Sequence, residues 1–260
     1  MNAERTEDAA VLTERRERIL IITLNRPEQR NAVNAAVAQG VAAALDELDA
    51  DAGLSVGVLT GAGKGFCAGM DLKAFVTGER PHVKGRGFAG IVERASEKPL
   101  IAAIEAFAVA GGLEVALACD LIVAARGARL GIPEVKRSLV AAGGALLRLP
   151  RALPRNVAME LALTGEAIEA ERAHELGLVN RLADPGQALE AALKLAEAIA
   201  ANGPLALAAT KRIMRESTGW PDSEFFARQA PIYEPVFSSE DAREGATAFS
   251  EGRGPIWKGR

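Results

Sequence analysis

The stretch that most constrains this chain runs from Ala110 to Glu134 and reads AGGLEVALACDLIVAARGARLGIPE. The pair Gly111-Gly112 is expected to begin an apolar helix that carries Glu114 in its first turn. Glu134 comes after the strand expected to follow this helix. A short helix out and a strand back would bring the two carboxyl groups face to face. Each acid alone has an ordinary explanation, as a helix-dipole partner or an exposed loop charge. Together with neighbouring glycine loops, the two acids predict a site for proton transfer.

The composition describes a globular chain that does not bind nucleic acid. Its 260 residues are 49% hydrophobic, 25% charged and only 4% aromatic, with a net charge of -3. Few aromatic rings and a negative balance argue against stacking on single strands or binding a polyanion. The N-terminal residues 1–18 hold acidic groups and no long apolar run, which predicts a loose leader and neither a signal peptide nor a membrane span.

Cysteine and histidine usage argues against disulfides and against a metal site. Cys67 and Cys119 are far apart and belong to no paired-cysteine motif, so we expect a reducing, cytoplasmic setting. The chain has only two histidines and no HExxH motif, so we expect no metal.

The rest of the chain alternates buried strands with helices and becomes helical at its end. Residues 17–25, 56–60, 100–104 and 178–182 read as strands, and residues 88–96 as a helix. Asn34 is expected to cap a helix through Leu48, and Asp71 another that begins at Leu72. Near the end, Pro231 and Pro235 are expected to break a helix.

Two glycine-rich segments invite a nucleotide interpretation that neither supports. The loop from Gly61 to Leu72, GAGKGFCAGMDL, lacks the Gly-Lys-Ser/Thr of a P-loop. Residues 85–90, GRGFAG, match the spelling of the dinucleotide fingerprint but follow charged residues instead of a buried strand. The glycines of the first loop instead let backbone amides approach a ligand closely.

The glycine pair at 111 and 112 supplies the electrostatic half of the predicted site. At a helix N-terminus these residues leave backbone amides free and the positive end of the helix dipole behind them. A second amide from the loop 61–72 would complete an oxyanion hole, with Glu114 and Glu134 beside the bound oxygen.

These segments resemble the crotonase family, also called the enoyl-CoA hydratase/isomerase family, over nearly the whole chain. The matching residues occur in family order and are specific. They are Asn25-Arg26-Pro27 with Asn31-Ala32, residues 65–72, Gly111-Gly112-Leu113-Glu114 with Cys119-Asp120, Ile132-Pro133-Glu134, Gly177-Leu178-Val179, and the end around Phe249, Pro255 and Trp257.

The resemblance implies an α/β fold, a crotonase-like spiral of ββα units over residues 1–200, followed by a C-terminal helical trimerisation region over 201–260. It implies that the amides of Met70 and Gly111 hold the thioester carbonyl of an acyl-CoA, which carries coenzyme A as part of the substrate and leaves no permanent cofactor. It also implies a homotrimer or dimer of trimers. The coenzyme would lie along Arg26, Ala32, Ala68, Asp71 and Leu72.

Two departures from the family pattern affect the substrate. Gly252 stands where many members have a lysine near the end, so a phosphate contact would have to come from Arg253 or Lys258. Residues 135–150, VKRSLVAAGGALLRLP, differ from short-chain hydratases and are expected on the acyl side, so the acyl group stays open.

Because both glutamates are present, the favoured activity is hydration of an enoyl-CoA, with Glu114 as base and Glu134 as acid. Two alternatives remain. In a double-bond isomerase Glu134 alone would shuttle the proton, and an acyl-CoA-binding paralogue would show no turnover.

Overall fold

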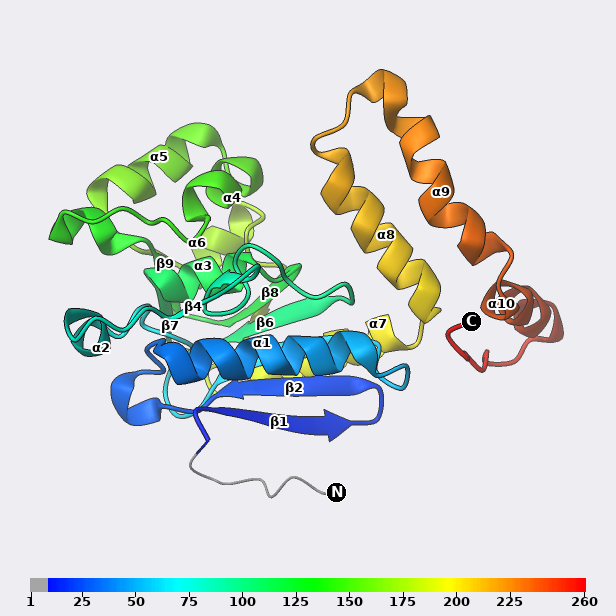
Figure 1. The fold of residues 1–260 in the computed structure, drawn as a ribbon, viewed down its shortest axis with the longest axis horizontal. Helices are drawn as coiled ribbons and strands as arrows, with labels where there is room; N and C mark the ends of the chain where they lie inside the picture. Colours follow the sequence, from blue (N-terminus) through cyan, green and yellow to red (C-terminus); the bar gives the residue numbers. More distant parts are fainter. Residues whose placement is uncertain (1–8) are drawn as a thin grey trace.

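The computed structural model describes residues 9–260, and its short runs of aliphatic residues form a six-stranded sheet (Figure 1). The strand order is β1-β2-β3-β6-β8-β11, and only the β1–β2 pair is antiparallel. The strands are β1 Val11–Arg16, β2 Ile19–Leu24, β3 Val56–Gly61, β6 Leu100–Ile104, β8 Leu121–Ala125 and β11 Arg181–Ala183.

Both faces of this sheet are covered, which explains why its inner strands are apolar on both sides. Leu20 and Ile22 of β2 face a large core that includes α1 Ala35–Ala50, which lies across the front of the sheet in Figure 1. Ile19 and Ile21 face a second core against α7 Ala188–Ala200. The period-two alternation of strand side chains therefore separates the two cores.

A smaller sheet lies beside the first and positions the candidate site. Its order is β10-β9-β7, with β7 parallel to β9. The strands are β7 Phe107–Val109, β9 Arg129–Gly131 and β10 Ile168–Glu169, and β4 His82–Val83 pairs with β5 Gly87–Phe88 in a hairpin. The remaining helices of the core are α2 Leu72–Val76, α3 Gly111–Leu117, α4 Ala145–Ala152, α5 Arg155–Thr164, α6 Ala170–Glu175 and the short 3-10 turns η1 Pro27–Gln29 and η2 Pro133–Arg137.

Beyond α7 the chain forms an arm of helices that stands to one side of the sheets (Figure 1). The arm consists of α8 Pro204–Ser217, the turn η3 Asp222–Glu224, α9 Phe225–Phe237 and α10 Glu240–Glu251. Lys211 of α8 ties it to the core through a 2.7 Å ion pair with Asp120 and a hydrogen bond to the Lys98 carbonyl. The domain boundary near residue 200 and the trimerisation role of this arm stay predictions.

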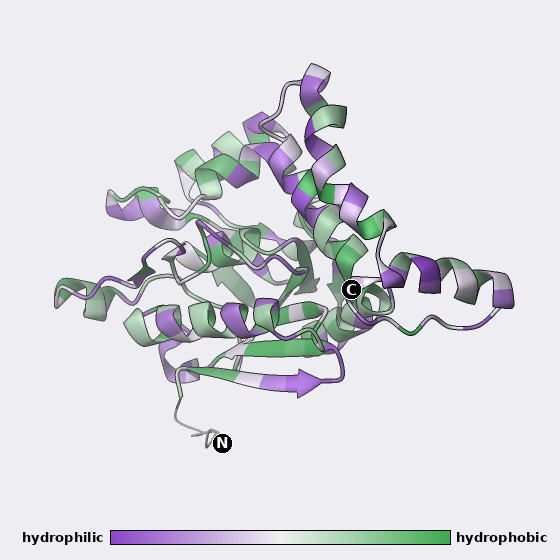
Figure 2. Ribbon diagram, turned by 45° about the vertical axis from the view of Figure 1, so that its right-hand side comes forward, coloured by the Kyte–Doolittle hydropathy of each residue, from purple (hydrophilic) through white to green (hydrophobic). Residues whose placement is uncertain are grey.

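Three sequence predictions about local structure need correction. Part of the predicted leader, residues 1–8, lies outside the described residues, but Val11–Arg16 is a strand hydrogen-bonded to β2. As an edge strand it is polar toward its end, as the colours of the outermost strand in Figure 2 show.

Residues 88–96 contain no helix. Ala89 and Gly90 have positive φ values of 54° and 70°, which interrupts any right-handed helix. The Val92 and Arg94 carbonyls accept hydrogen bonds from arginine side chains, Arg148 and Arg86 respectively, instead of from helical amides.

Pro231 and Pro235 lie inside α9 and do not break it. Both prolines are exposed, as is Ala227, so the carbonyls that their missing amides leave free are open to water. No helix within residues 9–260 is long and apolar enough to cross a membrane.

Replacing a fully buried side chain of α1 should destabilise the fold. Leu45 is 0% exposed, so Leu45→Ala should lower the free energy of unfolding by about 3 kcal/mol in a denaturant titration. Val76, which is 83% exposed, serves as the control, since Val76→Ala should change it by less than about 0.5 kcal/mol. Equal effects at the two positions would contradict this core assignment.

Candidate active site

The pairing of β7 with β9 brings together the two segments that carry the glutamates. Val109 and Gly131 are register partners at the ends of these parallel strands, and the Ala110 amide donates to the Gly131 carbonyl over 2.9 Å. Because carboxyl ends of parallel strands meet at one edge, the chain enters α3 and η2 at neighbouring points. The sequence prediction of one strand between the acids was therefore incomplete, since β8 lies in the large sheet and β9 beside β7.

Glu114 is a buried carboxyl group on α3, only 5% exposed. Its Oε1 accepts a hydrogen bond of 3.2 Å from the Ala145 amide, and the Gly143 amide also donates to this carboxylate. Burial raises the pKa of Glu114, while the two amides and the charge of Arg148 act in the opposite direction. The ionised form of Glu114 is therefore stabilised by two backbone amides and by the charge of Arg148.

Glu134 lies in a different environment on η2. Its Oε2 is buried and has no hydrogen-bond partner within residues 9–260. Burial raises the pKa of Glu134, and the charge of Glu114 raises it further against the lowering effects of its own backbone amide and Arg137. The charge of Glu114 thus acts on Glu134, which makes Glu134 the better candidate for the protonated form.

The loop before Met70 packs directly on the start of α3. Cys67 forms a parallel bridge with Ala108 of β7, and its carbonyl accepts the Val109 amide over 3.1 Å. Gly69 has a φ of 93°, and a Cβ at this position would lie 2.9 Å from the Gly111 nitrogen. A side chain at position 69 would therefore intrude between the loop and the helix.

Two backbone amides belong to this contact region: that of Met70, which follows Gly69, and that of Gly111, whose nitrogen lies close to Gly69. Among residues 9–260 neither amide donates a hydrogen bond to a protein acceptor. Unpaired backbone amides are the kind of donor that an oxyanion hole requires.

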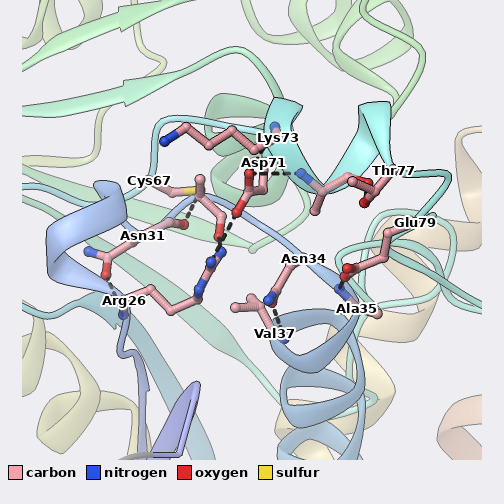
Figure 3. Close-up of polar contacts among 12 residues, drawn as sticks. Arg26, Asn31, Asn34, Ala35, Val37, Cys67, Asp71, Lys73, Thr77 and Glu79 are labelled. Carbon is pink, nitrogen blue, oxygen red and sulfur yellow. Dashed lines mark hydrogen bonds and ion pairs between the residues drawn. The ribbon is translucent and has the colours of Figure 1, made fainter.

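The residues predicted to line the coenzyme meet in one polar network, which Figure 3 shows around Arg26 and Asp71. Arg26 donates to the Ala32 carbonyl over 2.6 Å and pairs with the Asp71 carboxylate at 2.9 Å. Asp71 also caps α2 by accepting the amides of Lys73 and Ala74. Burial acts to raise the pKa of Asp71, but these amides and Arg26 lower it overall.

Ala68 and Leu72 flank this network. The Ala68 amide donates to the Arg30 carbonyl over 3.0 Å, and Leu72 begins α2 with 45% of its surface exposed. All five predicted coenzyme residues thus lie in or beside this network. The side chains of Arg26 and Asp71 form an ion pair with each other.

Asn31 has a structural role that its sequence context did not reveal. Its side chain accepts the Arg26 amide and donates to the carbonyls of Ala62 and Gly65 at 2.9 and 2.8 Å. Asn31 is 1% exposed and therefore fixes the course of the glycine loop from inside. Arg148 was also not singled out from the sequence. The one sequence signal for it is a charged residue within a run of leucines.

The two basic residues proposed to replace the lysine missing at Gly252 are both paired. Arg253 contacts Glu244 and Glu251, and Lys258 contacts Glu240. A phosphate contact from either residue stays a prediction. Within residues 9–260 no three His, Cys, Asp or Glu side chains gather as a metal site.

Known proteins resemble this chain over nearly its whole length. The family model for enoyl-CoA hydratase/isomerase matches residues 14–260. The crystal structure of enoyl-CoA hydratase EchA1 from Mycobacterium marinum is 63% identical, with a TM-score of 0.96 over 97% of this chain and 100% of that chain. Enoyl-CoA hydratase EchA19 of Mycobacterium tuberculosis is 44% identical over 96% of both chains. Carnitinyl-CoA dehydratase of Salmonella typhi is 41% identical over 93% of this chain and 95% of the relative.

The chain therefore belongs to the enoyl-CoA hydratase/isomerase family, the crotonase family. The predicted family and its crotonase-like α/β fold are confirmed.

Adding a methyl group at Gly69 should impair enoyl-CoA turnover more than it impairs stability. Gly69→Ala places a Cβ against the Gly111 nitrogen, so turnover of a trans-2-enoyl-CoA should fall about a hundredfold. Gly78→Ala is a matched control, because Gly78 has the same φ of 93° with nothing within 4 Å of its Cβ position. Both variants should lose about 1 kcal/mol of stability from the left-handed backbone. Equal activity of the two variants would show that the close approach at position 69 is unimportant.

Proposed function

We propose that this chain is an enoyl-CoA hydratase, which adds water across the 2,3 double bond of an enoyl-CoA thioester. The observation that carries the proposal is the pair of carboxyl groups with opposite surroundings. Glu114 has amide donors and a nearby cation that favour its ionised form, whereas Glu134 has a buried oxygen without a partner beside a like charge. Burial raises the pKa of both groups, but only Glu114 has a nearby cation and two amide donors from another segment, and such a difference is typical of a general base and a general acid in one site.

In the proposed reaction Glu114 removes a proton from water as the water oxygen bonds to the β-carbon. The electron pair of the double bond moves toward the thioester and forms an enolate. Glu134 then donates its proton to the α-carbon, which yields the 3-hydroxyacyl thioester. The family relationship to a carnitinyl-CoA dehydratase is consistent with this step, since dehydration is its reverse.

The enolate oxygen needs electrostatic stabilisation, and we assign it to the amides of Met70 and Gly111. Support comes from their lack of protein acceptors and from the contact of Gly69 with Gly111. Loss of one such donor costs about 3 to 4 kcal/mol of barrier stabilisation in other enzymes.

We further propose that coenzyme A, as part of the substrate, lies along Arg26, Ala32, Ala68, Asp71 and Leu72. Because the Arg26 and Asp71 side chains bind each other, the coenzyme contacts would come mainly from backbone atoms and the exposed Leu72. A homotrimer or dimer of trimers in the cytoplasm completes the proposal.

The acyl group is proposed to be apolar and uncharged. Residues 135–147, which follow Glu134, carry exposed apolar side chains and two cations, Arg137 and Lys136, the latter paired with Glu166. The exposed apolar residues are Val135, Leu139, Val140, Leu146 and Leu147. A quaternary ammonium group, as in a carnitine-derived substrate, is recognised best by Trp and Tyr rings, and this chain has both types only at 220 and beyond.

Single carboxyl-to-amide replacements should separate hydration from isomerisation. Glu114→Gln and Glu134→Gln should each lower kcat for hydration about a hundredfold or more, because each removes one proton-transfer group. Glu160→Gln, on the exposed side of α5, is the matched control and should leave the rate unchanged. The assay follows loss of the conjugated enoyl-thioester absorbance.

Hydration that survives Glu114→Gln would contradict the two-acid mechanism. Turnover of a 3-enoyl-CoA in that variant would instead favour the isomerase, in which Glu134 acts alone. Binding of acyl-CoA by the unaltered protein without any turnover would identify a non-catalytic paralogue.

A substrate panel tests the acyl proposal. Straight-chain trans-2-enoyl-CoA thioesters should show kcat/KM values at least about tenfold above that of the trimethylammonium-bearing crotonobetainyl-CoA, because residues 135–147 offer its cation no Trp or Tyr ring and include the exposed Arg137. The opposite order would overturn the apolar assignment while leaving the hydratase mechanism intact.

A further inference from the structure

Arg148 of α4 lies half-buried behind the candidate site, and its guanidinium holds two separate backbone segments. Its Nη2 donates to the Val92 carbonyl over 2.6 Å, and its Nη1 donates to the Gly143 carbonyl over 3.4 Å. The guanidinium also covers Gly144, since a Cβ there would lie 2.2 Å from Nη1. One side chain therefore bridges the turn before α4 and the segment after β5.

Both segments contact the residues proposed to act on substrate. The turn 143–145 supplies the two amides that bind the Glu114 carboxylate, and a Cβ at Gly143 would lie 2.5 Å from Oε2 of Glu114. The segment after β5 follows Phe88, whose ring lies 2.7 Å from where a Cβ of Gly111 would be. Displacement of either segment would alter the surroundings of Glu114 or Gly111.

We propose that Arg148 is a positioning residue for Glu114: it fixes the turn 143–145 against the carboxylate and supplies the cation that balances its ionised form. Arg148 and Glu114 form no direct ion pair within residues 9–260, so the guanidinium acts through the turn and through its charge. The proposal rests on the proposed function, in which Glu114 is the base.

The charges around Glu114 leave Arg148 as its principal cation. Arg148 of α4 is the charged group that lowers the pKa of Glu114. On η2, the charge of Glu114 raises the pKa of Glu134 and Arg137 lowers it. Cys119 is close to Arg148, but burial raises the pKa of its thiol so far that it stays neutral. Arg151 lies at the exposed end of α4, and its charge lowers the pKa of Arg148.

Arginine suits this position better than lysine. A planar guanidinium can donate in two directions at fixed angles, whereas an ammonium offers a compact charge on a flexible stem. The separate carbonyls of Val92 and Gly143 use that planar geometry.

The test compares Arg148→Met, Arg148→Lys and the control Arg151→Met, each as the full-length protein. Removal of the Arg148 charge takes away an effect that lowers the pKa of Glu114, so its carboxylate should protonate at higher pH. The acidic limb of the kcat/KM profile for a trans-2-enoyl-CoA should therefore move upward by about half a unit or more in Arg148→Met. Its optimal kcat should fall about tenfold to a hundredfold.

Arg148→Lys keeps the charge and should retain the wild-type acidic limb with a reduced kcat. Arg151→Met should match the wild type in both readouts, because an exposed charge is screened by solvent. A reduced kcat with an unmoved acidic limb in Arg148→Met would show a merely structural role and overturn the proposal. An unchanged rate and profile would overturn it too.

A second measurement keeps the test independent of turnover. Carboxyl carbon NMR titration, with the Glu114 signal assigned by its loss in Glu114→Gln, should show a higher pKa in Arg148→Met than in the wild type. An equal pKa in the two proteins would overturn the proposal. A raised pKa in a protein without hydration activity would refute the proposed function and leave the role of Arg148 standing. If Arg148→Met does not fold, the comparison of Arg148→Lys with Arg151→Met decides, since equal kcat values would exclude a positioning role.

Discussion

The parallel pairing of β7 with β9 is the interaction on which the site depends. These strands have only three residues each, yet their register sets Val109 beside Gly131 and so starts α3 next to η2. The Cys67 bridge to Ala108 adds the glycine loop on the other side of β7. Three segments that are distant in the sequence thus converge at one end of a small sheet, where the proposed proton-transfer site lies.

Small residues make this convergence sterically possible. A Cβ at Gly112 would lie 2.1 Å from the Cys67 carbonyl, and one at Gly69 would meet the nitrogen of Gly111. Close backbone approach brings the loop before Met70 against the start of α3, where we propose that the amides of Met70 and Gly111 bind one oxygen without reorganisation during the reaction. The two carboxyl groups differ because Glu114 accepts amides of the turn 143–145, whereas Oε2 of Glu134 has no partner among residues 9–260.

Much of the site was predictable from short motifs, because backbone chemistry there requires particular residues. Gly69, Gly111 and Asp71 were recognisable since close approach demands glycine and a helix N-terminus favours a carboxylate cap. The absence of a helix at 88–96 was not predicted, because one of the arginines that bind its carbonyls, Arg148, lies 56 positions further along the chain. The unbroken α9 was missed because the exposure of its prolines is a tertiary property.

The sequence by itself determined the family, the alternation of buried strands with helices, and the residue types that a thioester-activating site needs. These features are local: periodicity, caps and glycine content follow from neighbouring residues. Only the tertiary structure decided that β9 lies beside β7 and that Arg26 forms an ion pair with Asp71. It also decided that Arg148 binds the turn that contacts Glu114. Those outcomes depend on contacts between distant segments, whose geometry is fixed when both cores pack around the large sheet.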